Sequence, residues 1–308
     1  MIDLVVFLVY REWRCYMSKI RGMILGAFIG DAIALGPHWI YNIEDIKQQF
    51  GMINGLTAPT TSYHSTKVRG DFTHYGDQAL MLLQYLKLSV VIEEEPFYEY
   101  YYNYMKNYKG YIDHATKITM ENIERDIPEG SHSSELGGFT RFPGIVYFNS
   151  KDPKKGIDQV VLQTKMTHND PLLLERVIFL TELIYKVIKG EKPSEAIQNM
   201  KKTASKKIYS DIDKAKNLLT YDTTQAIKQL GQSCDSDYAF PAVLYFILKY
   251  EDHFDEALIE NIYAGGDSAA RGITIGAVLG AYHGDKKIPV NWLASMNEFR
   301  TIENLLMA

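Results

Sequence analysis

The sequence has few cysteines, no excess of positive charge and no long hydrophobic run. Only Cys15 and Cys234 occur among 308 residues, so neither a disulfide framework nor a cysteine zinc site is expected. Two free thiols are typical of a reducing compartment, and we expect a cytoplasmic protein. The formal net charge of −5 at pH 7 disfavours nucleic-acid binding. The apolar stretch 4–10 is far shorter than the roughly 20 residues of a membrane helix, so no membrane partner is expected; the oligomeric state stays open.

Several sequence motifs are also absent. No Walker loop, dinucleotide fingerprint, nucleophile elbow or zinc-helix motif occurs, and no alternating stretch carries hairpin chemistry. Helical patterns dominate instead, and the polar stretch 57–74 is expected to be a long loop. The sequence therefore predicts one all-α domain of packed helices, which include residues 77–91 (with Asp77 as the N-cap), 172–188, 193–207, 223–230, 239–250 and 255–263.

The first sixteen residues are a separate question. Residues 4–10 follow Asp3 rather than a basic stretch and lack a cleavage site, so they make a poor signal peptide. Met17 leads directly into the first glycine-rich helix. We interpret 1–16 as an N-terminal extension or a mis-assigned start, and 17–308 as the domain. A short N-terminal strand or docking segment is the competing interpretation.

Two segments carry glycine at every fourth position. Gly22, Gly26 and Gly30 are followed by Asp31, and Asp267 precedes glycines at 272, 276, 280 and 284. Residues four apart share one face of a helix, and each interior glycine costs about 1 kcal/mol relative to alanine. Such a stripe indicates that another backbone must approach closely.

The aspartates and histidines near these stripes are the candidate chemical groups. Asp31, Asp77 and Asp267 each lie beside glycine at an expected helix boundary. Each could be an ordinary cap or turn residue, whereas together they could bind Mg²⁺ or share acid and base roles. A histidine in the position of His38 is more often a packed, hydrogen-bonded residue than a chemical group. His168 is more simply a residue that fixes the loop before a helix capped by Asn169 or Asp170.

Two further clusters have simple structural explanations. Seven tyrosines between residues 98 and 111 could stack on bases or sugars, but their spacing covers every face of a helix, so most must pack or lie at the surface. The lysines at 201, 202, 206 and 207 are most simply a solvated helix face.

Five short motifs together resemble the ADP-ribosylglycohydrolase family. They occur in family order and span about residues 18–295, so the resemblance covers nearly the whole chain. It implies an all-α fold of packed antiparallel helices with a central cleft, and active members that use two Mg²⁺ ions to cleave the bond between ADP-ribose and an acceptor. The motifs are the helix 22–42, Tyr75-Gly76-Asp77-Gln78, Thr167-His168, Gly265-Gly266-Asp267-Ser268 and Ile288-Pro289-Val290-Asn291-Trp292-Leu293.

The departures from the family pattern fall on its metal ligands. Active members have Thr-Asp-Asp-Thr at 75–78, and Asp-Thr-Asp-Thr or a serine variant at 267–270, where this chain has Asp267-Ser268-Ala269-Ala270. The family's glutamate falls on His38, and residues 135–141 replace a Gly-Asn-Gly stretch before Arg. Mg²⁺ therefore remains a cofactor implied by resemblance, with an incomplete ligand set. Nitrogen from His38 suits zinc or a transition metal better.

Three functions remain open on this basis. The first is a glycosidic-bond hydrolase of the ADP-ribosylglycohydrolase type with altered or no metal requirement. It would use Asp77, Asp267 and His38 as catalytic groups, with Asp77 and Asp267 also the metal candidates. By the resemblance, Asp31, Gly137, Arg141 and His168 would bind substrate. The second is a non-catalytic binder of ADP-ribose or a related nucleotide sugar, and the third is a structural protein, as in the lens crystallins that resemble this family.

Overall fold

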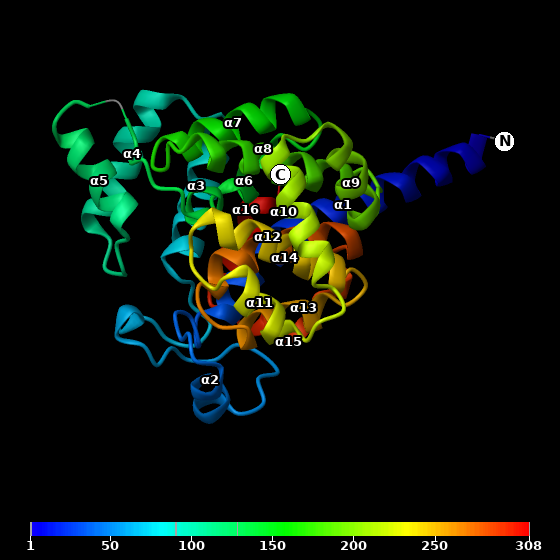
Figure 1. The fold of residues 1–308 in the computed structure, drawn as a ribbon. Coiled ribbons are helices and arrows are strands. Elements are labelled where there is room, and N and C mark those ends of the chain that lie inside the picture. The colour runs from blue at the N-terminus through cyan, green and yellow to red at the C-terminus, as the bar shows by residue number, and fades with distance from the viewer. Residues whose placement is uncertain (1, 90, 128, 308) are drawn as a thin grey trace.

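The two glycine-striped helices lie side by side at the centre of the fold (Figure 1). In this computed structural model, α1 (Ile2–Ala34) packs along α14 (Ser268–His283). A Cβ atom added to Gly26 would lie 2.1 Å from the Gly276 carbonyl oxygen. The same holds for Gly22 with Gly280 at 2.1 Å and Gly30 with Gly272 at 2.0 Å. The expected close backbone approach is confirmed, each stripe is the partner of the other, and the pairing order makes the helices antiparallel.

The structure describes residues 2–89, 91–127 and 129–307, with side chains from residue 10 onward. These residues form α-helices and short 3₁₀ turns and no named strand, which confirms the all-α prediction. Beyond α1 and α14, the α-helices are α2 (Ile43–Phe50), α3 (His74–Ser89), α4 (Glu94–Asn107), α5 (His114–Glu124), α6 (Phe142–Phe148), α7 (Pro153–Lys165), α8 (Pro171–Ile188), α9 (Pro193–Met200), α10 (Lys206–Asn217), α11 (Thr223–Leu230), α12 (Ser236–Lys249), α13 (Phe254–Tyr263), α15 (Val290–Ser295) and α16 (Phe299–Leu306).

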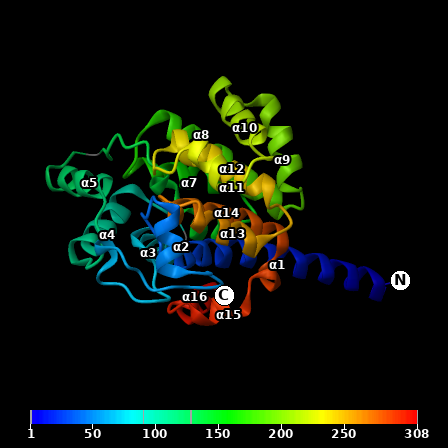
Figure 2. The same cartoon turned by 60° about the horizontal axis from the view of Figure 1, so that its bottom comes forward.

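The remaining helices surround this central pair. Both α1 and α14 contact α3, α8 and α13; α14 also contacts α12, and α1 also contacts α6 and α15. α14 is buried on every side from Ser268 to Ala281, as expected of a helix that is apolar all round. Figure 2 shows α15 and α16 covering the opposite side of α1 from α12. The ends of the central pair, at Asp31 and Asp267, are thereby held inside the molecule.

The N-terminal part of α1 projects from the body of the protein (Figures 1 and 2). Tyr10 and Trp13 on this part are each 54% exposed. The segment is helical rather than a strand, and α1 continues through Met17 without a break. The division into 1–16 and 17–308 stays a prediction. No described helix is long and apolar enough to cross a membrane.

Three expected helix boundaries are wrong, and one of them is the start of α12, which lies at Ser236 rather than at residue 239. α3 begins at His74, so Asp77 lies inside its first turn and does not cap it. The expected helix 193–207 ends at Met200, and a new helix begins at Lys206 because the Ser205 hydroxyl accepts the Ile208 N–H at 3.3 Å. Asp170, in contrast, caps α8 as expected, through the Leu173 N–H at 2.8 Å.

Candidate functional site

Asp31, near the end of α1, ties that helix to the start of α3. Its carboxylate accepts the Thr73 backbone N–H at 2.7 Å and the Thr73 hydroxyl at 2.6 Å. Full burial raises the pKa of Asp31 to about 7 in spite of these hydrogen bonds. Since both oxygens accept hydrogen bonds from Thr73, Asp31 fixes the start of α3, and its role as a substrate-binding residue stays a prediction.

The Asp31 carboxylate also fills the space beside Gly76. A Cβ atom on Gly76 would lie 2.4 Å from Asp31 Oδ2 and 2.8 Å from Phe72 Cβ. No larger side chain fits at position 76 unless these groups move. The packing around Gly76 therefore leaves no room for the aspartate that the family pattern has at this position.

Asp77 lies one residue further along α3 and is paired with protein groups. The Lys67 ammonium and the Tyr108 hydroxyl both donate to its Oδ2 atom. Burial raises the pKa of Asp77, and the charge and hydrogen bond of Lys67 act in the opposite direction. The side chains of Lys67 and Asp77 are only 14% and 15% exposed, so the ion pair is largely removed from solvent.

Asp77 borders an open cavity of about 480 Å³. Charged side chains of both signs and two tyrosines line it, namely Lys67, Lys109, Asp71, Asp77, Glu298, Tyr104 and Tyr108. The rings of Tyr104 and Tyr108 stack with centroids 5.8 Å apart. Of the three predicted catalytic groups, Asp77 is the one that reaches a described cavity.

Asp267 is the N-cap of α14, and its carboxylate is occupied by protein donors. It accepts the Ala270 N–H at 3.2 Å and the Tyr75 hydroxyl at 2.9 Å. Full burial raises the pKa of Asp267, whereas the nearby Arg271 guanidinium lowers it. Arg271 is itself fixed by Asn261 Oδ1 at 3.0 Å and the Gly265 carbonyl at 2.6 Å. The cap alternative considered for Asp267 is confirmed.

His38 is buried between aromatic rings rather than directed into a cavity. Its ring lies 4.4 Å from Trp39, 5.2 Å from His64 and 6.1 Å from Tyr75, measured between centroids. Its Nδ1 atom is 3.9 Å from Asp267 Oδ1, beyond hydrogen-bond distance, and neither ring nitrogen has a partner among the described residues. Burial lowers the pKa of His38 well below its usual value, so the ring is neutral.

Trp39 and His64 pack on His38. The rings of Tyr63, His74 and Tyr111 pack on Trp39 in turn, and we call these five residues the aromatic cover. Trp39 packs edge-on against Tyr63 and Tyr111 with centroids 5.1 and 4.8 Å away. The backbone of Trp39 adopts φ +65°, a left-handed conformation that is strained for a bulky residue. Its N–H is fixed by the Gly266 carbonyl at 3.1 Å. The cover separates His38 and Asp267 from solvent.

Arg141 is buried and saturated by protein acceptors. It donates to Gln163 Oε1 at 2.8 Å, to Gln78 Oε1 at 2.9 Å and to the Thr167 hydroxyl. His168 Nδ1 lies 2.9 Å from the same hydroxyl, and burial lowers the pKa of His168 to about 3. The structure therefore brings together the predicted substrate residues Arg141 and His168, in an internal network.

Gly137 packs against the ring of Tyr75. A Cβ atom there would lie 2.5 Å from the Tyr75 ring, so Gly137 makes room for the tyrosine that holds Asp267. Its role as a substrate residue, like those of Arg141 and His168, stays a prediction.

Three residues of the site were missed by the sequence analysis: Lys67, Tyr75 and Tyr108. Tyr75 was noted only as the residue that replaces a threonine, and Lys67 is one of two cations, with Arg69, in a long polar loop. No local pattern marks either of them. Tyr108 belongs to the tyrosine run, where spacing alone did not distinguish it from its neighbours.

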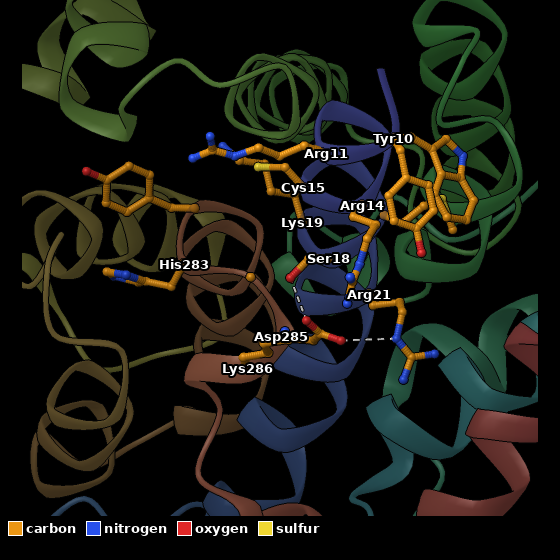
Figure 3. Close-up of a pocket in the computed structure, with 14 residues that line it drawn as sticks. Tyr10, Arg11, Arg14, Cys15, Ser18, Lys19, Arg21, His283, Asp285 and Lys286 are labelled. Carbon is orange, nitrogen blue, oxygen red and sulfur yellow. Dashed lines mark hydrogen bonds and ion pairs between the residues drawn. The ribbon is translucent and has the colours of Figure 1, made fainter. Parts of the chain in front are cut away.

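A second cavity lies away from Asp31, Asp77 and Asp267. It has a volume of about 660 Å³ and lies between the projecting part of α1 and the end of α14 (Figure 3). Asp285 projects between the two helices there and accepts hydrogen bonds from Ser18 at 2.5 Å and from Arg21 at 3.1 Å. This cavity therefore lies at the end of the helix pair that is opposite to the candidate site.

Comparison with known proteins identifies the family of this chain and the fold that it shares with a solved structure. The sequence model described as ADP-ribosylglycohydrolase matches residues 14–308. The chain belongs to the ADP-ribosylglycohydrolase family. A solved structure described as an ADP-ribosylglycohydrolase-related protein complex shares the fold with a TM-score of 0.72 at 17% identity, over 95% of this chain and 97% of that one.

The curated relatives of this ADP-ribosylglycohydrolase family member are distant. An uncharacterized protein of Archaeoglobus fulgidus is 23% identical over 94% of each chain. Crystallin J1B of Tripedalia cystophora is 20% identical over 90% of this chain and 91% of its own. ADP-ribosylhydrolase ARH3 of Mus musculus is 22% identical over 94% of this chain and 90% of its own.

The residues present do not fit the pair of Mg²⁺ ions that the ADP-ribosylglycohydrolase family implies. Two adjacent divalent ions need many hard oxygen ligands in near-octahedral geometry. Here Asp77 is paired with Lys67, Asp267 with Tyr75, and position 76 has no room for a carboxylate. The described residues contain no group of three or more His, Cys, Asp or Glu side chains that could hold a metal.

Proposed function

We propose that this member of a hydrolase family binds a nucleotide sugar of the ADP-ribose class without the family's Mg²⁺-dependent hydrolysis. The observation that carries the proposal is the pairing of Asp77 with Lys67 and of Asp267 with Tyr75. A carboxylate that already has an ammonium or phenol partner has less to gain from a divalent ion. A non-catalytic binder was the second of the functions considered from the sequence.

The cavity beside Asp77 has the chemistry that such a ligand needs. Lys109 can pair with a diphosphate, and the stacked rings of Tyr104 and Tyr108 offer an aromatic surface for a base or ribose. The carboxylates of Asp71, Asp77 and Glu298 can accept ribose hydroxyl groups. Its volume of about 480 Å³ lies within the range of small-molecule sites.

Calorimetry with ADP-ribose, in EDTA and in millimolar MgCl₂, tests the proposal. We expect saturable binding that is unchanged by Mg²⁺, weaker binding in Lys109→Ala, and unchanged binding in the control Lys117→Ala on α5. Multiple-turnover cleavage of an ADP-ribosylated substrate that requires Mg²⁺ would contradict the proposal. So would the absence of any saturable binding, a result that would favour a structural role like that suggested by the name of the crystallin relative.

Metal-independent hydrolysis at Asp77 is a second candidate. Asp77 alone among the predicted catalytic groups lines the cavity, and burial raises its pKa toward the range of a general acid or base. Asp267 and His38 are shielded by Tyr75 and the aromatic cover. Release of free ADP-ribose in EDTA, abolished by Asp77→Asn and retained in Asp267→Asn, would establish this candidate over simple binding.

A further inference from the structure

We infer that Lys67 is a tethered cation: its ammonium provides, from within the chain, the positive charge that the Asp77 site would otherwise draw from a metal ion. The inference rests on the proposed function in so far as both require an Asp77 site that works without a divalent ion. It concerns a residue to which neither the family pattern nor the comparisons assign a role.

The first support is the pairing itself. Lys67 Nζ and the Tyr108 hydroxyl meet at one oxygen of Asp77, and the ion pair is about six-sevenths buried. Removal of one partner of a buried ion pair strongly destabilises the folded protein, because the other charge is left uncompensated. Some cation must therefore accompany Asp77 whenever it is ionised in this environment.

The second support is the way in which Lys67 is held. Its Nζ lies 5.7 Å from the centroid of the Tyr108 ring, a favourable position for a cation over an aromatic face. Its backbone N–H donates to the His64 carbonyl at 2.9 Å. Ring, carboxylate and backbone thus fix the ammonium in one place, unlike the end of an exposed lysine.

The third support is the charge balance around Asp77. Asp31 and Asp71 are the carboxyl groups whose charges interact with that of Asp77, and Glu298 also lines the cavity. Both oxygens of Asp31 accept hydrogen bonds from Thr73, at 2.7 and 2.6 Å, so its charge is met by other donors. Asp71 is turned toward the Val68 N–H at 2.8 Å and the Asn297 amide at 2.8 Å. A single ammonium is therefore sufficient for Asp77, and a divalent ion would be in excess.

Removal of the ammonium should convert this region into a cation-responsive site. In Lys67→Ala, the oxygens of Asp77, with those of Asp31 and Asp71 nearby, lose the positive charge that balances them. Carboxylate oxygens are the donors that Mn²⁺ and Mg²⁺ prefer. A divalent ion that binds only the folded state would then raise its stability.

Thermal unfolding in EDTA and in millimolar MnCl₂, without nucleotide, provides the test. We expect no shift of Tm with Mn²⁺ for the wild type, and a lower Tm in EDTA for Lys67→Ala that recovers by about 2–4 °C in Mn²⁺. The double variant Lys67→Ala/Asp77→Asn should lose this recovery. Lys201→Ala is the matched control, because Lys201 is similarly shielded and paired with Asp213, and it should show no recovery.

Two results would overturn the inference. One is a Lys67→Ala protein that Mn²⁺ stabilises no more than the Lys201→Ala control, and the other is an equal Mn²⁺ response in the wild type. If Lys67→Ala does not fold, Lys67→Gln retains the stem of the side chain and is judged by the same two results. Because no nucleotide is present, failure here is separate from failure of the proposed ligand binding.

Discussion

At the scale of single residues, the interior around the candidate site contains an unusual number of histidines without hydrogen-bond partners. Both ring nitrogens of His38 and His74, and one of His64, have none among the described residues. Burial is the main cause that lowers the pKa values of His64 and His74 to about 4 each. These rings therefore remain neutral in the folded protein at pH values where they would be charged in the unfolded chain.

Acidification should destabilise the protein through these histidines. Between pH 6.5 and about 4, the unfolded state binds protons that folded His64 and His74 do not, so the free energy of unfolding falls as pH falls through this window. Asp31 acts in the opposite direction, since a folded pKa of about 7 makes its contribution fall as pH rises from about 4 to 7.

A variant of His64 isolates the contribution of that histidine to acid sensitivity. His64→Gln should flatten the acid limb of a stability curve measured by urea unfolding between pH 7 and 4.5. His132→Gln, at a histidine whose side chain is 78% exposed, should leave the curve unchanged. Parallel curves for the wild type and His64→Gln would show that His64 does not contribute to acid sensitivity.

At the scale of elements, the glycine stripes of α1 and α14 determine how the two helices meet. Their sequence pattern was sufficient to predict a close backbone approach, because no other contact explains glycine at every fourth position. The pattern did not predict the contents of the site between the helix ends. Lys67 and Tyr75 meet Asp77 and Asp267 through contacts across 10 and 192 residues, and no local spacing encodes such contacts.

Gly26→Ala should be strongly destabilising despite the better helix propensity of alanine. The added Cβ would lie 2.1 Å from the Gly276 carbonyl oxygen, so the helices must separate, and we expect a loss of about 3 kcal/mol or more. Gly55→Ala is the control, since its Cβ would meet Trp292 at an ordinary 3.5 Å. Chemical denaturation measures both, and similar midpoints for the two variants would contradict this account of the stripe.

At the scale of the whole molecule, the all-α class and several of the helices followed from hydrophobic periodicity and capping residues, whereas other helices, such as α5 and α7, and some helix boundaries did not. Asp77 was expected to cap α3, but the chain enters the helix three residues earlier because Asp31 holds Thr73 at its start. That interaction joins residues 42 positions apart, so the local sequence around Asp77 gave no sign of it.

The projecting part of α1 should be dispensable for the fold. A protein that starts at Met17 loses the Tyr16 hydrogen bond to the Ser150 carbonyl at 2.8 Å. The other described side chains that it loses, those of residues 10–15, are exposed. We expect its Tm to lie within about 2 °C of the full chain. Circular dichroism melts of the two proteins check this, and a much lower Tm for the shorter one would show that the projection is part of the folded core.

The repeat of the glycine stripes also leaves the register of the two helices underdetermined. A slip of α1 by four residues, about 6 Å along its axis, would place Gly22 opposite Gly276 and Gly26 opposite Gly272, so two glycine pairs would survive. The hydrogen bonds of Ser18 and Arg21 to Asp285 would not survive that slip. The hydrogen bonds of Asp285 therefore fix the register of the two helices. Among near-equivalent alignments they select the one in which Asp31 reaches Thr73 and Asp267 reaches Tyr75.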